Sequence, residues 1–243
     1  MATSLPPSRH AGAASASPDR TGSVYETLRD LIIQGRIAPG ARVIEAEVAA
    51  RLDVSRTPVR AALQRLQQEG YVVANGSGLQ LRLSVAPLTQ EDASELFEIV
   101  GEVEGLAARR AATLPPDRRQ RLVTEMDALN AALLAASKAA APDAREIFDL
   151  DHRFHRAWVD GAAGPRLTAM HDAIKPQTDR YIRLYISALV DEIGTSVLEH
   201  DVTTRALEAG QPDSAQVAVR TNWNHAARRL ARVIESLGER GAW

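Results

Sequence analysis

The sequence predicts a mainly α-helical protein in which a small N-terminal domain precedes a larger helical bundle. Alanine, which has the highest intrinsic helix propensity, supplies 42 of the 243 residues, while aromatic residues make up only 4%. Few segments show the apolar–polar alternation that is typical of strands. Proline and glycine divide the second half of the chain into segments of helical length. Together these observations favour helices almost throughout.

Composition excludes several classes of protein. The chain is 45% hydrophobic and 25% charged, as in ordinary globular domains. It has no cysteine, which excludes disulfides and thiolate metal sites. No apolar run approaches the roughly 20 residues that cross a bilayer, and the N-terminus lacks the apolar core of a signal peptide. We therefore expect a cytoplasmic protein with no membrane partner and a disordered tail over residues 1–20.

Three helices are predicted in the N-terminal domain. The first carries apolar residues at helical spacing from Val24 and ends at Gly35. A second, short helix covers residues 43–52. The third begins after Ser55, which can cap it, and ends at Gly70.

A β-hairpin is predicted directly after these helices. Its glycine-rich turn covers residues 75–78, and Leu79, Leu81 and Leu83 alternate with polar residues in the second strand. Three helices followed by a hairpin is the order of a winged helix-turn-helix domain, which we place at residues 21–86.

The remaining chain, residues 87–243, is predicted to form a bundle of about six helices. Thr89 and Asp92 resemble a capping box at the start of the first helix, with Asp in place of the usual Glu. Breaks at proline and glycine separate the helices, which are expected near residues 90–113, 117–139, 143–161, 165–189, 195–209 and 213–238.

Charge is divided unevenly between the two predicted domains. The whole chain carries a formal net charge of −2. Residues 20–85 hold nine Arg against six Asp and Glu, whereas residues 86–243 hold nineteen Lys and Arg against twenty-four Asp and Glu. A small basic domain joined to a larger acidic one is consistent with a polyanion-binding module on a body that does something else.

The start of the third helix carries side chains that suit DNA recognition. In a helix-turn-helix, the N-terminal end of the second motif helix enters the major groove. Arginine reads guanine, and serine and threonine hydroxyls suit phosphates. The candidates are Ser55, Arg56, Thr57 and Arg60. From the residues alone, a solvated surface helix remains the alternative interpretation.

Residues 24–72 resemble the N-terminal domain of the GntR family of bacterial transcription regulators. The resemblance is carried by Ile33 to Gly35, Pro39-Gly40, Val54 to Arg60 and the ending Leu66 to Gly70. Ala61 departs from the family, which usually has Glu there. The resemblance implies binding to double-stranded operator DNA through the four candidates above, with Gly76 and Gly78 of the wing near the minor groove.

A second group of candidates suits a metal ion. Asp151 and His155 are four residues apart and share one helix face. His200 lies on a later helix, and Asn222 and His225 lie on the last one. Facing helices of a bundle commonly hold metals with such oxygen and imidazole ligands. From spacing alone, a surface Asp–His pair remains the simpler interpretation.

Residues 90–238 resemble the FCD domain, the helical effector domain of the FadR subfamily of GntR regulators. The resemblance is carried by Leu96, Glu104, Ala107-Ala108, Asp151 with Phe154-His155, and Glu199-His200. It implies that Asp151, His155 and His200 hold a divalent metal of Zn, Ni or Mn type. Asn222 falls where the family has a further His, with His225 as the alternative.

The same resemblance implies a small organic acid as the effector. Arg180 and Arg183, which flank Tyr181, are placed to donate charge-assisted hydrogen bonds to such an anion. The alternative for these arginines is a solvated face.

The leading hypothesis is therefore a DNA-binding regulator, a repressor acting as a homodimer, controlled by this effector. Two-fold symmetry would match a pseudo-palindromic operator. A sensor for which the metal itself is the effector is one alternative. A metal-dependent hydrolase is another, but no general base stands out and the DNA-binding domain would be unexplained, so we do not expect an enzyme.

Overall fold

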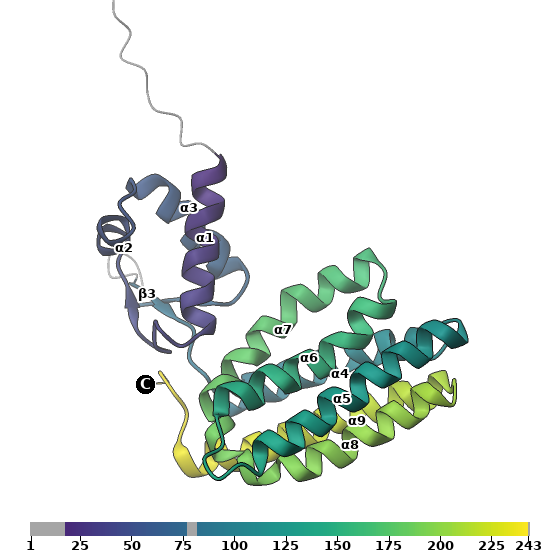
Figure 1. The fold of residues 1–243 in the computed structure, drawn as a ribbon. Helices are drawn as coiled ribbons and strands as arrows, with labels where there is room; N and C mark the ends of the chain where they lie inside the picture. Colours follow the sequence, from purple (N-terminus) through teal and green to yellow (C-terminus); the bar gives the residue numbers. More distant parts are fainter. Residues whose placement is uncertain (1–17, 77–81, 243) are drawn as a thin grey trace, which may run out of the picture.

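The computed structural model describes residues 18–76 and 82–242, which form two parts joined by a short linker (Figure 1). We call residues 18–86 the head and residues 87–242 the bundle, and residues 86–89, which connect β3 to α4, the linker. No helix of the described residues is long and apolar enough to cross a membrane.

The head is a three-helix domain closed by a small antiparallel sheet. Its elements are α1 (Pro18–Ile33), β1 (Arg42–Val43), α2 (Glu45–Arg51), α3 (Arg56–Gln68), β2 (Val72–Asn75) and β3 (Arg82–Val85). The strands lie in the order β1-β3-β2, with Val72 opposite Val85. Leu28 of α1 and Val59, Leu63 and Leu66 of α3 are buried in the core, so α3 is held firmly by one face while the other stays free.

Some boundaries in the head differ from the predictions. α1 begins at Pro18, so the end of the predicted disordered tail is helical, and residues 1–17 lie outside the described residues. Val43 was expected in a helix but lies in β1 opposite Leu83. A strand of two residues is too short to show a period of two, so no sequence pattern could reveal it. Gly78, Leu79 and Leu81 also lie outside the described residues.

The bundle contains six long helices, as predicted. They are α4 (Gln90–Ala111), α5 (Pro116–Ser137), α6 (Ala144–Ala162), α7 (Pro165–Tyr185), α8 (Ile193–Glu208) and α9 (Pro212–Leu237). The predicted helix over 165–189 is too long. α7 ends at Tyr185, and the short 3-10 turns η2 (Ile186–Ala188) and η3 (Val190–Glu192) lead into α8. This stretch has no proline or glycine to mark the change.

α4 and α9 lie side by side along the bundle (Figure 1). Gly101 allows this close approach, because a Cβ built there would lie only 3.0 Å from the Cβ of Trp223. Trp223 also packs edge-on against Phe97, with ring centroids 5.2 Å apart. The contact brings the middle of α4 next to α9 deep inside the bundle, where the site described below is built.

The C-terminal segment joins the two parts a second time. Leu88 of the linker and Arg240 exchange two backbone hydrogen bonds of 2.8 and 3.1 Å. Gly241 then touches the head, since a Cβ built on Gly40 would lie 2.6 Å from the Cα of Gly241. The head therefore rests on the bundle at both the linker and this segment.

Candidate DNA interface and metal centre

The four predicted DNA-contacting residues of α3 are all exposed. Ser55 is the N-cap residue, but its side chain makes no capping hydrogen bond. Pro58 and Val59, directly after Thr57, are buried and fix the first turn of the helix. The start of α3 thus presents polar side chains to solvent from a rigid base, as a helix that enters a groove must do.

Arg60 has a partner within the head. Its guanidinium forms a bidentate ion pair with the carboxylate of Glu45 in α2, with N–O distances of 3.0 to 3.3 Å. Hydrogen bonding to Arg60 lowers the pKa of Glu45. Because 62% of the Arg60 side chain is exposed, the pair is screened and weak, and Arg60 stays available to another acceptor.

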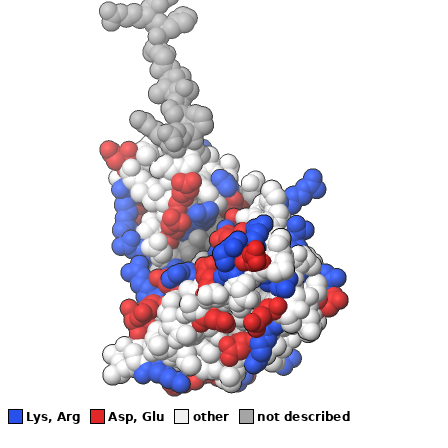
Figure 2. Space-filling model, turned by 45° about the vertical axis from the view of Figure 1, so that its right-hand side comes forward, with Lys and Arg blue, Asp and Glu red and all other residues white. Residues whose placement is uncertain are grey.

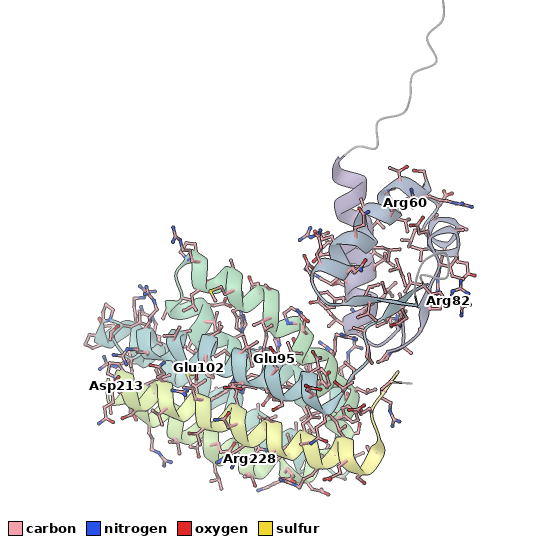
Figure 3. The ribbon with its side chains drawn as sticks, turned by 180° about the vertical axis from the view of Figure 1, so that it is seen from behind. Arg60, Arg82, Glu95, Glu102, Asp213 and Arg228 are labelled. Carbon is pink, nitrogen blue, oxygen red and sulfur yellow. The ribbon has the colours of Figure 1, made fainter. Side chains whose placement is uncertain are left out.

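The wing adds a cation that the sequence reasoning did not single out. Gly76 begins the turn with a φ of 95°, which suits glycine. Arg82 follows the turn at the start of β3 and is exposed. Figure 3 shows Arg60 and Arg82 on the side of the head that faces away from the bundle. In the sequence, Arg82 could have been found from the alternation of β3, which directs this side chain away from the core.

The bundle brings three predicted metal ligands together. Asp151 and His155 of α6 and His200 of α8 place one ligand atom each within 4.8 Å of one another. The Nε2 atom of His200 lies 3.7 Å from Oδ1 of Asp151. Among the described residues this Nε2 is buried and has no hydrogen-bond partner. A buried polar atom without a partner is costly, so a ligand at this point would remove a real penalty.

Asn130 of α5 fixes the orientation of His200. The Nδ2 of Asn130 donates to the carbonyl of Val197 at 3.0 Å and to Asp201 at 2.7 Å. Its Oδ1 therefore accepts from Nδ1 of His200, at 3.0 Å, which leaves the lone pair on Nε2. Burial, together with the charges of His155 and Arg229, holds the pKa of His200 well below its usual range. The imidazole is thus neutral, the form that binds metals.

Glu104 of α4 performs the same role for His155. This fully buried carboxylate accepts from Nδ1 of His155 at 2.8 Å, Nε1 of Trp223 at 2.8 Å and Nε2 of His171 at 3.1 Å. Burial alone would raise the pKa of Glu104, but the charge and hydrogen bond of His155, the hydrogen bond of His171 and the charge of Lys175 lower it. A carboxylate behind a histidine is the usual support for a metal ligand.

Asn222 of α9 lies on the wall of the same cavity, and His225 does not. Nδ2 of Asn222 donates to Glu199 at 2.9 Å, and Glu199 also holds Arg229 through two bonds of 3.0 Å. The ring of His225 contacts Glu199 from outside and is 42% exposed. The structure therefore favours Asn222 over His225 as the neighbour of the three ligands.

The cavity is small. The volume open to the centres of water-sized molecules is about 60 Å³. One water needs about 10–15 Å³ of such space, so an ion and a few ligand atoms would fill it. Ile182 and Ile186 form part of its apolar wall, and Ser196 and Arg229 supply polar groups.

The predicted effector residues of α7 lie elsewhere, so their assignment to this cavity is corrected. Arg180 donates to the carbonyl of Ala86 at 2.7 Å, and the hydroxyl of Tyr181 donates to Asp92 at 2.5 Å. Arg183 lies over the ring of Phe148, 3.7 Å from its centroid. The face of α7 that reaches the cavity carries Ile182, which Ile186 follows at the start of η2, and the adjacent positions of α7 point toward the head and linker.

Sequence reasoning also missed polar residues that support the predicted ligands or line their cavity, namely Asn130 and Arg229. Glu104 and Glu199 entered it only as part of the family resemblance. One further signal for Glu104 was present. Glu104 interrupts the apolar stripe of α4 that is formed by Phe97, Val100, Ala108 and Ala111. A charged residue in such a stripe is normally buried together with polar partners.

A winged helix with exposed arginines at the start of its second motif helix, joined to a helical domain that encloses a polar cavity, defines a DNA-binding transcription regulator of two-domain type. The gntR family of bacterial regulatory proteins matches residues 20–79, and the FCD domain matches residues 95–225. The chain belongs to the GntR family, in its FadR subfamily with a C-terminal FCD domain.

Proteins that are similar to this chain over most of its length are also regulators. An uncharacterized HTH-type transcriptional regulator in the TAR-I ttuE-ttuC' intergenic region of Agrobacterium vitis is 31% identical, over 66% of this chain and 91% of that protein. A probable D-xylose utilization operon transcriptional repressor of Paenarthrobacter nicotinovorans is 28% identical, over 89% and 91%. The solved structure of E. coli McbR/YncC has the same fold, with a TM-score of 0.65 at 21% identity over 88% of this chain and 97% of that one.

Proposed function

We propose that the protein is a repressor whose operator binding is controlled by a small organic acid held in the bundle through a divalent metal. Residues 21–86 would read the DNA, and residues 87–243 would bind the effector and form the homodimer. The observation that carries the proposal is the convergence of Asp151, His155 and His200 on a point where the buried Nε2 of His200 has no partner in the part of the chain that the structure describes.

The ligand atoms at this point determine which metals would bind. Two imidazole nitrogens and a carboxylate oxygen suit Zn, Ni or Mn, and the amide of Asn222 is a weaker oxygen donor nearby. Three protein ligands leave positions open, and a bound ion would offer these to the oxygens of a carboxylate. The volume of about 60 Å³ limits the acid to a few non-hydrogen atoms inside the cavity.

α7 offers a physical link from the cavity to the head. Ile182 and Ile186 line the cavity, while Arg180 on the same stretch of chain donates to the carbonyl of Ala86 in the linker. A ligand that shifts this stretch changes the position of the linker and hence of the DNA-reading helices. Such coupling requires only that ligand and operator favour different conformers.

The proposal is tested by elemental analysis beside DNA binding. Purified wild-type protein should contain close to one divalent ion per chain, and His155→Ala close to none. His225→Ala is the matched control and should keep the ion, because His225 lies outside the cavity. Equal metal content in wild type and His155→Ala would overturn the metal assignment.

Operator control is measured separately, with DNA from upstream of the regulator's own gene. Titration with small carboxylates that suit this volume, namely acetate, glycolate and lactate, should release the metal-loaded wild type from this DNA, and His155→Ala should not respond. Release by the metal alone, with no acid, would instead support a metal sensor. The narrow cavity favours that second candidate, because an ion fits it without any organic ligand.

A further inference from the structure

We propose that the cleft between the head and the bundle is a second ligand site, which binds a small oxyanion bearing a phosphate or carboxylate group. The cleft is lined by the end of α1, by Pro39, by α7 and by the C-terminal segment. Its side chains include Arg180, Arg183 and Arg240. Lys, Arg, Asp and Glu side chains gather along the seam between the two parts in Figure 2.

Arg180 is the strongest indication. Only 5% of this residue is exposed, and within the described residues its guanidinium donates one hydrogen bond, to the carbonyl of Ala86. No carboxylate of the described residues lies within 4.0 Å of its guanidinium. A guanidinium has five N–H donors, and a buried charge without a counter-ion is strongly disfavoured. An anion in the cleft would supply the counter-charge and accept from N–H groups that the carbonyl of Ala86 does not engage.

Arg183 reinforces this arrangement from the next turn of α7. Its Nε is buried without a partner among the described residues, and its nearest carboxylate oxygen, on Asp149, is 3.7 Å away. The guanidinium lies over Phe148, which leaves its edge free to donate. Arg36 and Arg145 line a neighbouring hollow that shares Arg183, so the surroundings are rich in cations.

Size and geometry define the ligand class. The volume of the cleft that is open to the centres of water-sized molecules is about 340 Å³, compared with about 60 Å³ for the metal cavity. The cleft therefore admits a larger molecule. Planar guanidinium groups match the paired oxygens of phosphate and carboxylate. Since Arg180 already holds the linker, an anion here would also fix the head against the bundle.

The test is calorimetric titration of the full-length protein, stripped of metal and then dialysed free of chelator into low-chloride buffer, with inorganic phosphate and succinate as probes. Without metal, binding cannot occur through an ion in the cavity, and the variants below separate the cleft from the cavity, so the result is independent of the function proposed above. Wild type should bind one anion per chain with at least one probe. The stronger probe identifies the source as phosphorylated or carboxylic.

Arg180→Gln and Arg183→Gln should each weaken this binding about tenfold or more, the value for one lost charge-assisted hydrogen bond. Arg232→Gln, an exposed arginine paired with Glu192 in the bundle, is the matched control and should bind as wild type. Arg183→Gln carries the test if Arg180→Gln does not fold. Lack of binding of both probes to wild type, or unchanged binding in Arg183→Gln, would overturn the proposal and leave these arginines as a structural clamp.

Discussion

The head and the bundle present their binding side chains in opposite ways. In the head, Arg60 is 62% exposed and its partner Glu45 is easily replaced by another acceptor. In the bundle, His200 is only 1% exposed, and Asn130 dictates which nitrogen faces the cavity. A surface that meets a large partner can remain mobile, whereas a cavity that holds an ion must be ordered in advance.

The variant with the largest expected effect on this contrast is Glu104→Gln. An amide cannot accept from three converging N–H groups, so one of its own N–H groups would face another donor. We expect metal affinity to fall about 10–100-fold and the free energy of unfolding to fall by about 3 kcal/mol. Metal titration and urea unfolding measure the two effects. Glu102→Gln, on the same helix but half-exposed in a surface ion pair with Arg220, should change neither.

Next in size is the loss of the DNA-reading arginines. Arg56→Ala and Arg60→Ala should each weaken specific operator binding by about 1–3 kcal/mol, because a guanidinium bound to a base edge is lost. Fluorescence anisotropy checks this, with thermal unfolding unchanged. Arg228→Ala, an exposed arginine of α9, is the control. Wild-type affinity in both variants of α3 would remove this helix from the interface.

A smaller effect concerns pH. Because burial lowers the pKa of His200 below 6.5, the unfolded chain binds a proton between pH 6.5 and 5.5 that the folded protein does not. The free energy of unfolding should therefore fall by about 1 kcal/mol from this residue as the pH drops through that range. Above about pH 7.5 the contribution is constant.

Urea unfolding in EDTA at pH 7.5, 6.5 and 5.5 measures this pH dependence, with His200→Gln as the comparison. Glu104 and Asp179 have lowered pKa values and stay ionised throughout the range. An identical pH dependence in His200→Gln would contradict the expectation.

The smallest effect is expected for Glu45→Gln. The ion pair with Arg60 is exposed and screened by solvent, so stability should hardly change. Operator affinity should rise about two- to fivefold, because Arg60 is released and a negative charge is removed near the DNA. Anisotropy at two salt concentrations checks this. A large loss of affinity would instead make Glu45 a residue that positions Arg60 for its contact.

The contrast also explains which features the sequence could predict. The proposed DNA-contacting residues lie within one short run, from Ser55 to Arg60, and local spacing predicts their exposure at one helix end, which the structure shows. The six long helices follow from apolar periodicity and from proline and glycine breaks. Both depend on residues that are close together in the chain.

The interior of the bundle depends on contacts between distant residues. Glu104 and His155 are 51 positions apart, and Asn130 and His200 are 70 apart. No local pattern reports that these side chains meet. Arg180 and Arg183 were expected at the cavity because their charge suits an acid, but the face on which they lie is set by how α7 packs between linker and bundle.

The small size of the cavity also has a kinetic consequence. His155 and His200 are both almost fully covered, so the contents of the cavity exchange with solvent past the residues at its rim. The turns η2 and η3, with Leu189 between them, carry several of these wall residues, including Ile186 and Glu192, and lack the i to i+4 backbone pairing of the long helices. Movement of these turns therefore affects the exchange rate of the contents, however tightly they bind.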